Sequence, residues 1–207
     1  SAWNLDGGSA VTLTVHIVSG FTNYVAPAGG AISPYLSWGT AARDIQSAVN
    51  ANNYAGGVTL VADGIYTNEG PAAFGILTNI VALTNAITLR SQTGPSGAWI
   101  WGHGSPGSDD ELRCVYLGGD ARIEGFTIHQ GATRDVGSAY VDQSGAGVCS
   151  ESGGGVSNCY LFGNIADDCG GGTFNAQVVD SVFEVNFADY GAGAYGGMAS
   201  RCVFTNN

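Results

Sequence analysis

The sequence predicts an all-β protein, a right-handed parallel β-helix in which short strands stack coil upon coil. The segment VSNCYLFGN (Val156–Asn164) is echoed by VDSVFEVN (Val179–Asn186) and by ASRCVFTNN (Ala199–Asn207). Glycine is abundant, at 34 of 207 residues, without the three-residue period of collagen. Only one segment has the apolar spacing of a helix. Short strands, many turn residues and an internal repeat together indicate a solenoid.

The repeat aligns apolar residues in columns along the chain. Cys159 and Ser181 are 22 residues apart, and Ser181 and Cys202 are 21 residues apart. One column holds Phe126, Cys159, Ser181 and Cys202, and a second holds Ile128, Leu161, Phe183 and Phe204. Small side chains such as those of Cys159, Ser181 and Cys202 suit a narrow core. Each unit ends in asparagine, and Asn164, Asn186 and Asn207 are expected to form a ladder of side-chain amides from coil to coil.

A second strand repeats with the same period. The segments GAGVC, GGGTF and GAGAY align, with Cys149, Phe174 and Tyr195 in one column. One coil is longer because the segment Ala132–Gln143 is inserted into it. Two strand columns with one period require stacking, since a single coil cannot bury its apolar face alone.

We expect one domain with three parts. Residues 1–34 form an N-terminal strand segment, with a strand at Val11–Val18, and residues 35–56 form a capping helix whose N-cap is Thr40 and which ends near Asn50. Residues 57–207 form the coils of the β-helix.

The composition excludes some classes of partner. The chain has no lysine and a net charge of −11. Nucleic acid binding is not expected, because phosphates require clustered cations. Membrane insertion is not expected either, because no apolar run approaches about 20 residues.

Five segments carry a resemblance to a known group. They are FTNYVAPAGG, PYLSWGTAARDIQSAVNA, VTLVADGIYT, RCVYLGGDARIEGFTIHQGATR and GGGVSNCYLFGNIADDCGGGTF. Over residues 21–207 the chain resembles bacterial extracellular proteins with pectin-lyase-like right-handed β-helix repeats. The resemblance implies a helix that caps the N-terminal end and a secreted or surface-anchored location. It implies no activity, because this fold carries lyases, hydrolases and proteins without assigned activity.

Catalytic patterns of that fold are incomplete here. Gly102-His103-Gly104 precedes Asp167-Asp168, the reverse of the order in polygalacturonase-type hydrolases, and the accompanying Arg-x-Lys cannot exist without lysine. Asp168 and Asp189 occupy equivalent positions on successive coils. This pair either binds Ca²⁺, which prefers several oxygen ligands, or consists of two solvated turn carboxylates.

Aromatic residues and cysteines supply the other candidate sites. Glycan-binding candidates are Tyr190, Tyr195, Trp99 and Trp101, since aromatic rings stack on the apolar faces of sugars; packing is the alternative interpretation of all four. Cys114 and Cys149 are expected on neighbouring coils, at a distance that permits a disulfide. Cys159 and Cys202 lie two coils apart, which is too far for a bond.

We therefore expect an extracellular or cell-surface β-helix scaffold for adhesion or assembly, without catalysis. The given sequence closes a repeat at Asn207, so open strand edges are expected there. Either a longer natural chain continues the solenoid, or another subunit covers the end, which would allow end-to-end self-association into filaments. A polysaccharide lyase or glycoside hydrolase acting on acidic glycans, and a non-catalytic glycan-binding module, are the alternatives. The insertion Ala132–Gln143 is the first place to look for a ligand.

Overall fold

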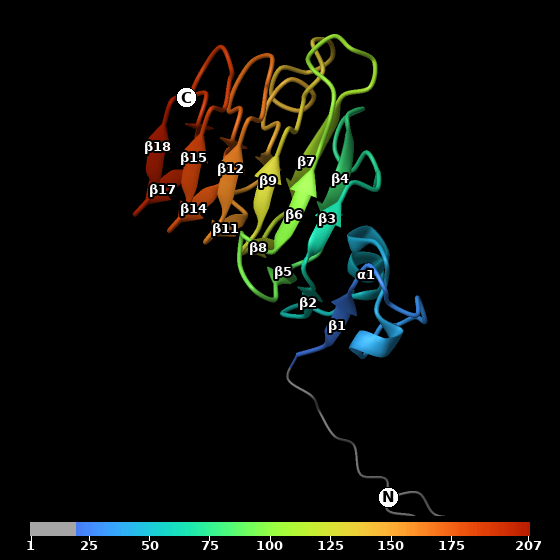
Figure 1. Cartoon of the computed structure of the whole chain (residues 1–207). Coiled ribbons are helices and arrows are strands. Elements are labelled where there is room, and N and C mark those ends of the chain that lie inside the picture. Colours follow the sequence, from blue (N-terminus) through green and yellow to red (C-terminus); the bar gives the residue numbers. More distant parts are fainter. Residues whose placement is uncertain (1–19) are drawn as a thin grey trace, which may run out of the picture.

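The computed structural model of the chain describes residues 20–207 as three parallel sheets around one core (Figure 1). The strand expected at Val11–Val18 lies outside the described residues. The seven-stranded sheet contains β1 (Thr22–Val25), β2 (Val58–Val61), β5 (Thr88–Ser91), β8 (Arg122–Glu124), β11 (Gly155–Ser157), β14 (Gln177–Val179) and β17 (Met198–Ser200). The six-stranded sheet contains β3 (Gly64–Tyr66), β6 (Ala98–Trp101), β9 (Thr127–His129), β12 (Tyr160–Phe162), β15 (Val182–Glu184) and β18 (Val203–Thr205). The five-stranded sheet contains β4 (Thr78–Leu83), β7 (Leu112–Leu117), β10 (Val148–Ser150), β13 (Thr173–Phe174) and β16 (Ala194–Tyr195).

Each full coil contributes one strand to each sheet in a constant order. The first complete coil runs through β2, β3 and β4, the next through β5, β6 and β7, and every sheet neighbour is parallel. The sequence prediction of an all-β parallel solenoid is confirmed at this level. The first rung of the seven-stranded sheet, β1, comes before the helix, and the repeat did not predict it.

The repeated apolar columns pair in register. Val156 pairs with Val178, and Leu161 pairs with Phe183, each on the neighbouring coil. All four side chains are buried and belong to the shared core. The ring of Phe204 stacks on that of Phe183, with centroids 4.5 Å apart and planes at 7°. Residues one period apart therefore occupy the same core position on successive coils.

An asparagine ladder connects the coils at one corner. The Oδ1 atom of Asn186 accepts hydrogen bonds from the backbone N–H and the side-chain amide of Asn164, at 3.1 and 2.8 Å. The Oδ1 atom of Asn207 accepts the same two bonds from Asn186, at 3.0 and 2.8 Å. Asn164 itself accepts from the N–H of Gly131 at 2.9 Å. Because Asn164 and Asn186 are buried, these bonds replace water for groups that are costly to leave unpaired.

Left-handed backbone recurs at equivalent positions of successive coils, including the position just before each ladder residue. Positive φ angles recur in one column at Gly125, Asn158, Asp180 and Arg201, and in a second at Gln130, Gly163, Val185 and Asn206. Glycine and asparagine adopt this region at little cost, whereas a β-branched residue there is strained. Val185, with φ of 54°, is the β-branched residue in these two columns.

The helix is shorter than the sequence prediction and begins later. Helix α1 spans Ile45–Ala51, and its N-cap is Asp44, whose carboxylate accepts from the N–H of Ser47 at 2.7 Å. The predicted N-cap Thr40 instead ends the short 3₁₀ turn η1 (Trp38–Thr40). The prediction of an N-cap at Thr40 was wrong because Ala42 forms a parallel bridge with Val25 of β1, so the chain between Thr40 and Asp44 is not helical. In the part of the chain that the structure covers, no helix is both long and apolar enough to cross a membrane.

Helix α1 and the preceding loop lie against the first coil, at the opposite end of the stack from β18 (Figure 1). The side-chain amide of Gln46 donates to the carbonyl of Ala82 at 3.2 Å and accepts from its N–H at 2.7 Å, and so occupies the free edge of β4. Backbone bonds from Tyr24 to Tyr35 and from Ala42 to Tyr24 occupy the edge of β1. The strand edges of β1 and β4 at this end of the solenoid are therefore occupied.

Replacing Val185 by glycine tests the strained corner. We expect Val185→Gly to raise the free energy of unfolding by about 1 kcal/mol, because the left-handed backbone costs an L-residue more than the entropy that glycine loses. Val182→Gly, three residues earlier within β15, is the matched control and should destabilise. Urea denaturation of both variants measures the difference; equal destabilisation by the two would contradict this account of the corner.

Candidate functional site

The outward face of the six-stranded sheet carries a strip of aromatic rings, which we call the aromatic strip: Trp99, Trp101, His129, Tyr160 and Phe162. The strip arises from strand alternation, because the central residues Ile100, Ile128 and Leu161 point into the core. Their neighbours on either side point outward. In-register pairing then aligns Trp101, His129 and Phe162 across three coils.

The rings of the strip contact one another both along the solenoid axis and along single strands. His129 stacks on Phe162, with centroids 4.9 Å apart and planes at 11°, and Trp101 meets His129 at 4.8 Å and 63°. Trp99 lies 6.1 Å from Trp101, and Tyr160 stacks 5.7 Å from Phe162. His129 is buried within the strip, while the other four rings are partly exposed. The result is a continuous aromatic surface three coils long.

Polar groups border the aromatic strip. The hydroxyl of Tyr160 donates to the carboxylate of Glu184 on the next coil, and the indole N–H of Trp101 donates to Gln130 at 2.6 Å. Partial burial, together with the nearby carboxylate of Glu184, raises the pKa of Tyr160 to about 12. The Tyr160 hydroxyl therefore stays protonated at neutral pH and remains a fixed donor to Glu184.

The four aromatic residues predicted from the sequence do not form one surface. Trp99 and Trp101 lie together on β6, on the six-stranded sheet. Tyr195 lies on β16, on the five-stranded sheet, where its ring is parallel to that of Phe174 at 5.9 Å. Tyr190 lies exposed at a turn, bridged to Cys169. The tryptophan pair belongs to the aromatic strip and the two tyrosines do not.

His129, Tyr160, Phe162 and Glu184 were missed as site residues, although the sequence contained a signal for them. The repeat had already aligned the core column of Ile128, Leu161 and Phe183. Residues on either side of a core position face outward in a strand, so the same alignment identifies the outer rows. These outer rows contain His129, Tyr160, Phe162 and Glu184.

The insertion Ala132–Gln143 is held firmly against the coils. The fully buried guanidinium of Arg113 donates to the carbonyls of Val141, Ser144 and Gly145 and to the side chain of Asn79. The buried carboxylate of Asp142 accepts from the N–H groups of Ile76, Leu77 and Ser138. The ring of Tyr140, which is exposed, lies 6.1 Å from that of Phe174. The insertion therefore covers part of the five-stranded sheet, whereas the aromatic strip lies on the six-stranded sheet.

Carboxylates gather where the insertion meets the coils. Asp168 and Asp189 lie on successive coils, joined by a bond from the N–H of Tyr190 to the carbonyl of Asp168. Asp167 lies beside them, and its pKa is raised by partial burial and then by the charges of Asp135, Asp189 and Asp168. Within residues 20–207, no three His, Cys, Asp or Glu side chains are grouped to hold a metal ion. Calcium binding by Asp168 and Asp189 stays a prediction.

The structure does not form the predicted Cys114–Cys149 disulfide, and both thiols are free in it. In the parallel pair β7–β10, Cys149 lies opposite Tyr116. Cys114 points into the hydrophobic core, where its thiol lies 3.3 Å from the carbonyl of His129, whereas Cys149 is buried outside that core cluster. Cys159 and Cys202 are also free, and the backbone N–H of Cys159 donates to the hydroxyl of Ser181 on the next coil at 3.1 Å.

The fold and this surface define a parallel β-solenoid with an aromatic outer face. No family model matches the chain, and neither curated proteins nor solved structures yielded a match.

Replacing Asp167 by asparagine tests the carboxylate group. The raised pKa means that ionising Asp167 costs more free energy in the folded state than in the unfolded state. Protonated Asp167 therefore adds to the stability below the ordinary aspartate pKa, and this contribution is lost as the pH rises through the raised pKa. Asp167→Asn should therefore raise the melting temperature at pH 7 by about 1–2 °C, a small effect because the side chain is largely solvated.

The gain should vanish at about pH 3, where aspartates are mostly protonated in either state. Calorimetry across pH measures it, with the exposed turn variant Asp120→Asn as control. A gain that is independent of pH would contradict the electrostatic explanation.

Proposed function

We propose that the chain is a non-catalytic glycan-binding scaffold of an extracellular or cell-surface protein, and that the aromatic strip is its binding surface. The observation that carries the proposal is the row of Trp101, His129 and Phe162, aligned across three coils beside Trp99 and Tyr160. Partly exposed aromatic rings with polar groups at their border are the composition of carbohydrate-binding surfaces, where rings meet the C–H faces of sugars and polar groups meet hydroxyls.

The direction of the strip favours an extended polysaccharide. Successive coils of a parallel sheet are about 4.8 Å apart, so the rows run along the solenoid axis with one residue per coil. One sugar of an extended glycan has a similar length. A chain lying along the axis can therefore place successive sugars over the row of Trp101, His129, Phe162 and Glu184, which lie on four successive coils.

The charges near the strip favour a neutral glycan. Glu184 borders it, and the chain as a whole carries a net charge of −11 without lysine. A polyanionic glycan would be repelled, while the carboxylate of Glu184 can accept hydrogen bonds from neutral hydroxyls. Acidic glycans, expected for the enzymatic alternative, are correspondingly disfavoured as ligands of this surface.

The finer features of the fold belong to the same proposal. We infer right-handed coils, since crossovers between parallel strands are right-handed in nearly all proteins. Helix α1 acts as the N-terminal cap, an inference supported by the Gln46–Ala82 pairing at the edge of β4.

The resemblance to bacterial extracellular pectin-lyase-like proteins supports the proposed extracellular or cell-surface location. Cys114, Cys149, Cys159 and Cys169 are buried, so free thiols are compatible with an oxidising surrounding.

Removing one ring of the strip tests glycan binding. Trp101→Ala should lower affinity for a neutral β-linked polysaccharide by at least about tenfold, because a large aromatic anchor carries a large share of the energy of a binding surface. Affinity electrophoresis in gels containing soluble β-glucan, xylan or polygalacturonate measures retardation.

Tyr195→Ala, which removes a ring from the five-stranded sheet, is the matched control and should leave retardation unchanged. The proposal fails if the parent chain is retarded by none of the neutral glycans, or if Trp101→Ala is retarded like the parent. Release of reducing ends or of unsaturated products by the parent chain would support the enzymatic alternative.

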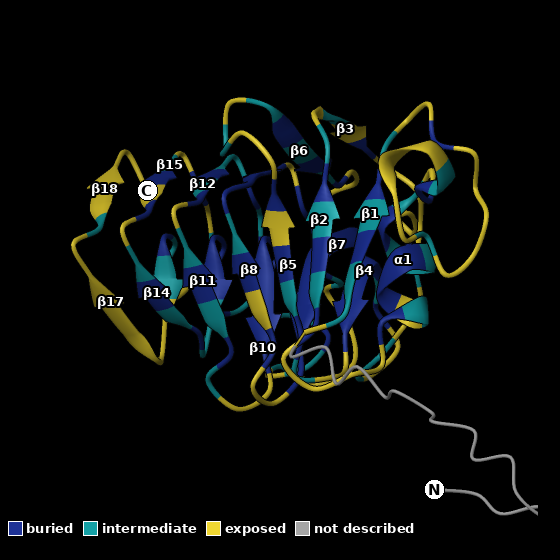
Figure 2. Cartoon of the chain, turned by 90° about the horizontal axis from the view of Figure 1, so that it is seen from below, coloured by how far each residue is buried: buried dark blue, intermediate teal, exposed yellow. Residues whose placement is uncertain are grey.

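Self-association is a second candidate function, favoured by the apolar surface of the last coil. Met198, Val203 and Phe204 are 71%, 55% and 49% exposed, and β17 and β18 form the yellow end of the solenoid in Figure 2. We propose that a further coil covers these strands, and that a second copy supplies it when the 207-residue chain is studied alone. Because α1 and its loop occupy edges at the other end, a two-fold pair through β16–β18 is favoured over the filament expected from the sequence.

Sedimentation at micromolar concentration tests this second candidate. The parent chain should sediment as a dimer and Met198→Asp as a monomer, because a charge in an apolar interface is costly to desolvate. Ile32→Asp, at an exposed apolar residue of the loop before α1, should remain dimeric. A monomeric parent chain would exclude association through the last coil.

A further inference from the structure

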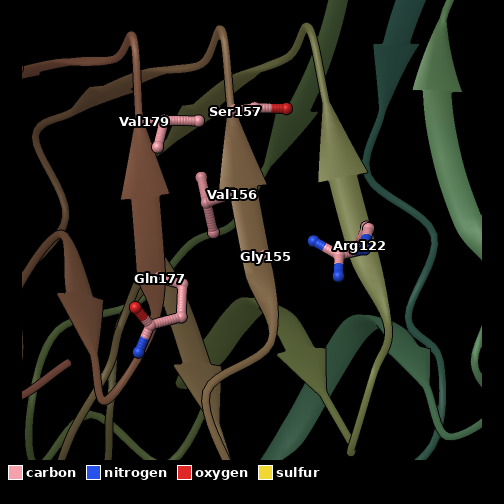
Figure 3. Close-up of a pocket in the computed structure, with 6 residues that line it drawn as sticks. All are labelled: Arg122, Gly155, Val156, Ser157, Gln177 and Val179. Atoms are coloured by element: carbon pink, nitrogen blue, oxygen red, sulfur yellow. The ribbon is translucent and has the colours of Figure 1, made fainter. Parts of the chain in front are cut away.

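A hollow of about 120 Å³ lies on the outward face of the seven-stranded sheet, away from the aromatic strip (Figure 3). It extends over β8, β11 and β14. The residues that line it are Arg122, Gly155, Val156, Ser157, Gln177 and Val179. Nothing in the proposed glycan surface uses these residues.

The hollow exists because one residue of an outer row lacks a side chain. In-register pairing places Gly155 between Arg122 and Gln177 on successive coils. The backbone at Gly155 does not have a positive φ, so the conformation itself does not require glycine. A Cβ atom there would lie 2.9 Å from Nη1 of Arg122 and 3.2 Å from its Cγ. Glycine at this position therefore makes room beneath the guanidinium.

The polar groups around the hollow are donors without partners in residues 20–207. Arg122 reaches from β8 toward Gly155, and the hydroxyl of Ser157 points toward β8 (Figure 3). The side chains of Arg122, Ser157 and Gln177 make no hydrogen bond within that range. By contrast, Arg90 pairs with Glu124, and Arg201 pairs with Asp180.

The electrostatics favour an anion of low charge. No carboxylate lines the hollow, and Glu124, which lies opposite Ser157 on β8, is already paired with Arg90. A guanidinium matches the planar fork of a carboxylate in bidentate geometry. The hollow offers one cation, Arg122, and the chain as a whole has a net charge of −11. The chain therefore repels a monoanion less than a dianion such as phosphate.

We propose that this hollow binds the carboxylate of a small organic monocarboxylate. Arg122 holds the carboxylate, Ser157 and Gln177 donate further hydrogen bonds, and the methyl groups of Val179 contact a short alkyl group. This site is independent of the glycan surface, since it lies on another sheet, and either can exist without the other.

Nuclear magnetic resonance of the full ¹⁵N-labelled chain tests the site, with sodium acetate as the probe. The arginine Nε–Hε signal of Arg122 should shift and saturate, with half-saturation at roughly 1–10 mM. The signal of Arg201, which is paired with Asp180, should not follow it. Sodium chloride at equal ionic strength should cause no saturable shift, and phosphate should bind more weakly than acetate.

Two variants separate the cavity from the charge. Gly155→Ala adds a methyl group at the base of the hollow, and Arg122→Gln removes the charge of an exposed side chain. Each variant should weaken acetate binding by at least about tenfold. The side-chain amide signal of Gln177 reports binding in both variants. Arg201→Gln is the control and should bind like the parent. The proposal is overturned if Arg122 does not shift saturably, if phosphate binds more tightly than acetate, or if both variants bind like the parent.

Discussion

The in-register stacking of successive coils, fixed at one corner by the Asn164–Asn186–Asn207 ladder, is the constraint on which the rest of the structure depends. The amide oxygens of Asn186 and Asn207 each accept two bonds from the asparagine one coil before, so a shift of one residue would leave buried polar groups unpaired. It would also turn each core side chain outward, because strand side chains alternate with a period of two. The ladder and the core columns thus select the same register.

That register also creates the outer surfaces. Once Leu161 lies under Phe183 in the core, the residues on either side of each core position form straight rows on the outside. On the six-stranded sheet the rows bring together rings from three coils. On the seven-stranded sheet the same rule places Gly155 between Arg122 and Gln177 and opens a hollow. Binding surfaces on a solenoid are therefore set by which residue types occupy equivalent outer positions.

The repeat predicted the core register, since Val156 with Val178 and Leu161 with Phe183 follow from the period alone. The start of the helix was not predictable from residue types, because Thr40 and Asp44 are both good N-caps and only the bridge of Ala42 to Val25 decides between them. Whether Cys114 and Cys149 approach each other also depends on tertiary pairing, because the register of β7 with β10 decides which face each cysteine occupies. The aromatic strip was implicit in the alignment, but the hollow was not, since its volume depends on the side-chain path of Arg122.

A direct measurement of the ladder tests the account most sharply. Scalar coupling across a hydrogen bond is detectable by nuclear magnetic resonance between a donor amide nitrogen and the acceptor carbonyl carbon. The account predicts coupling from the backbone ¹⁵N of Asn164 to the side-chain carbonyl carbon of Asn186, and from Asn186 to Asn207, with slow hydrogen exchange of both donor amides. Rapid exchange at Asn164 and Asn186 without either coupling would contradict in-register stacking of the coils.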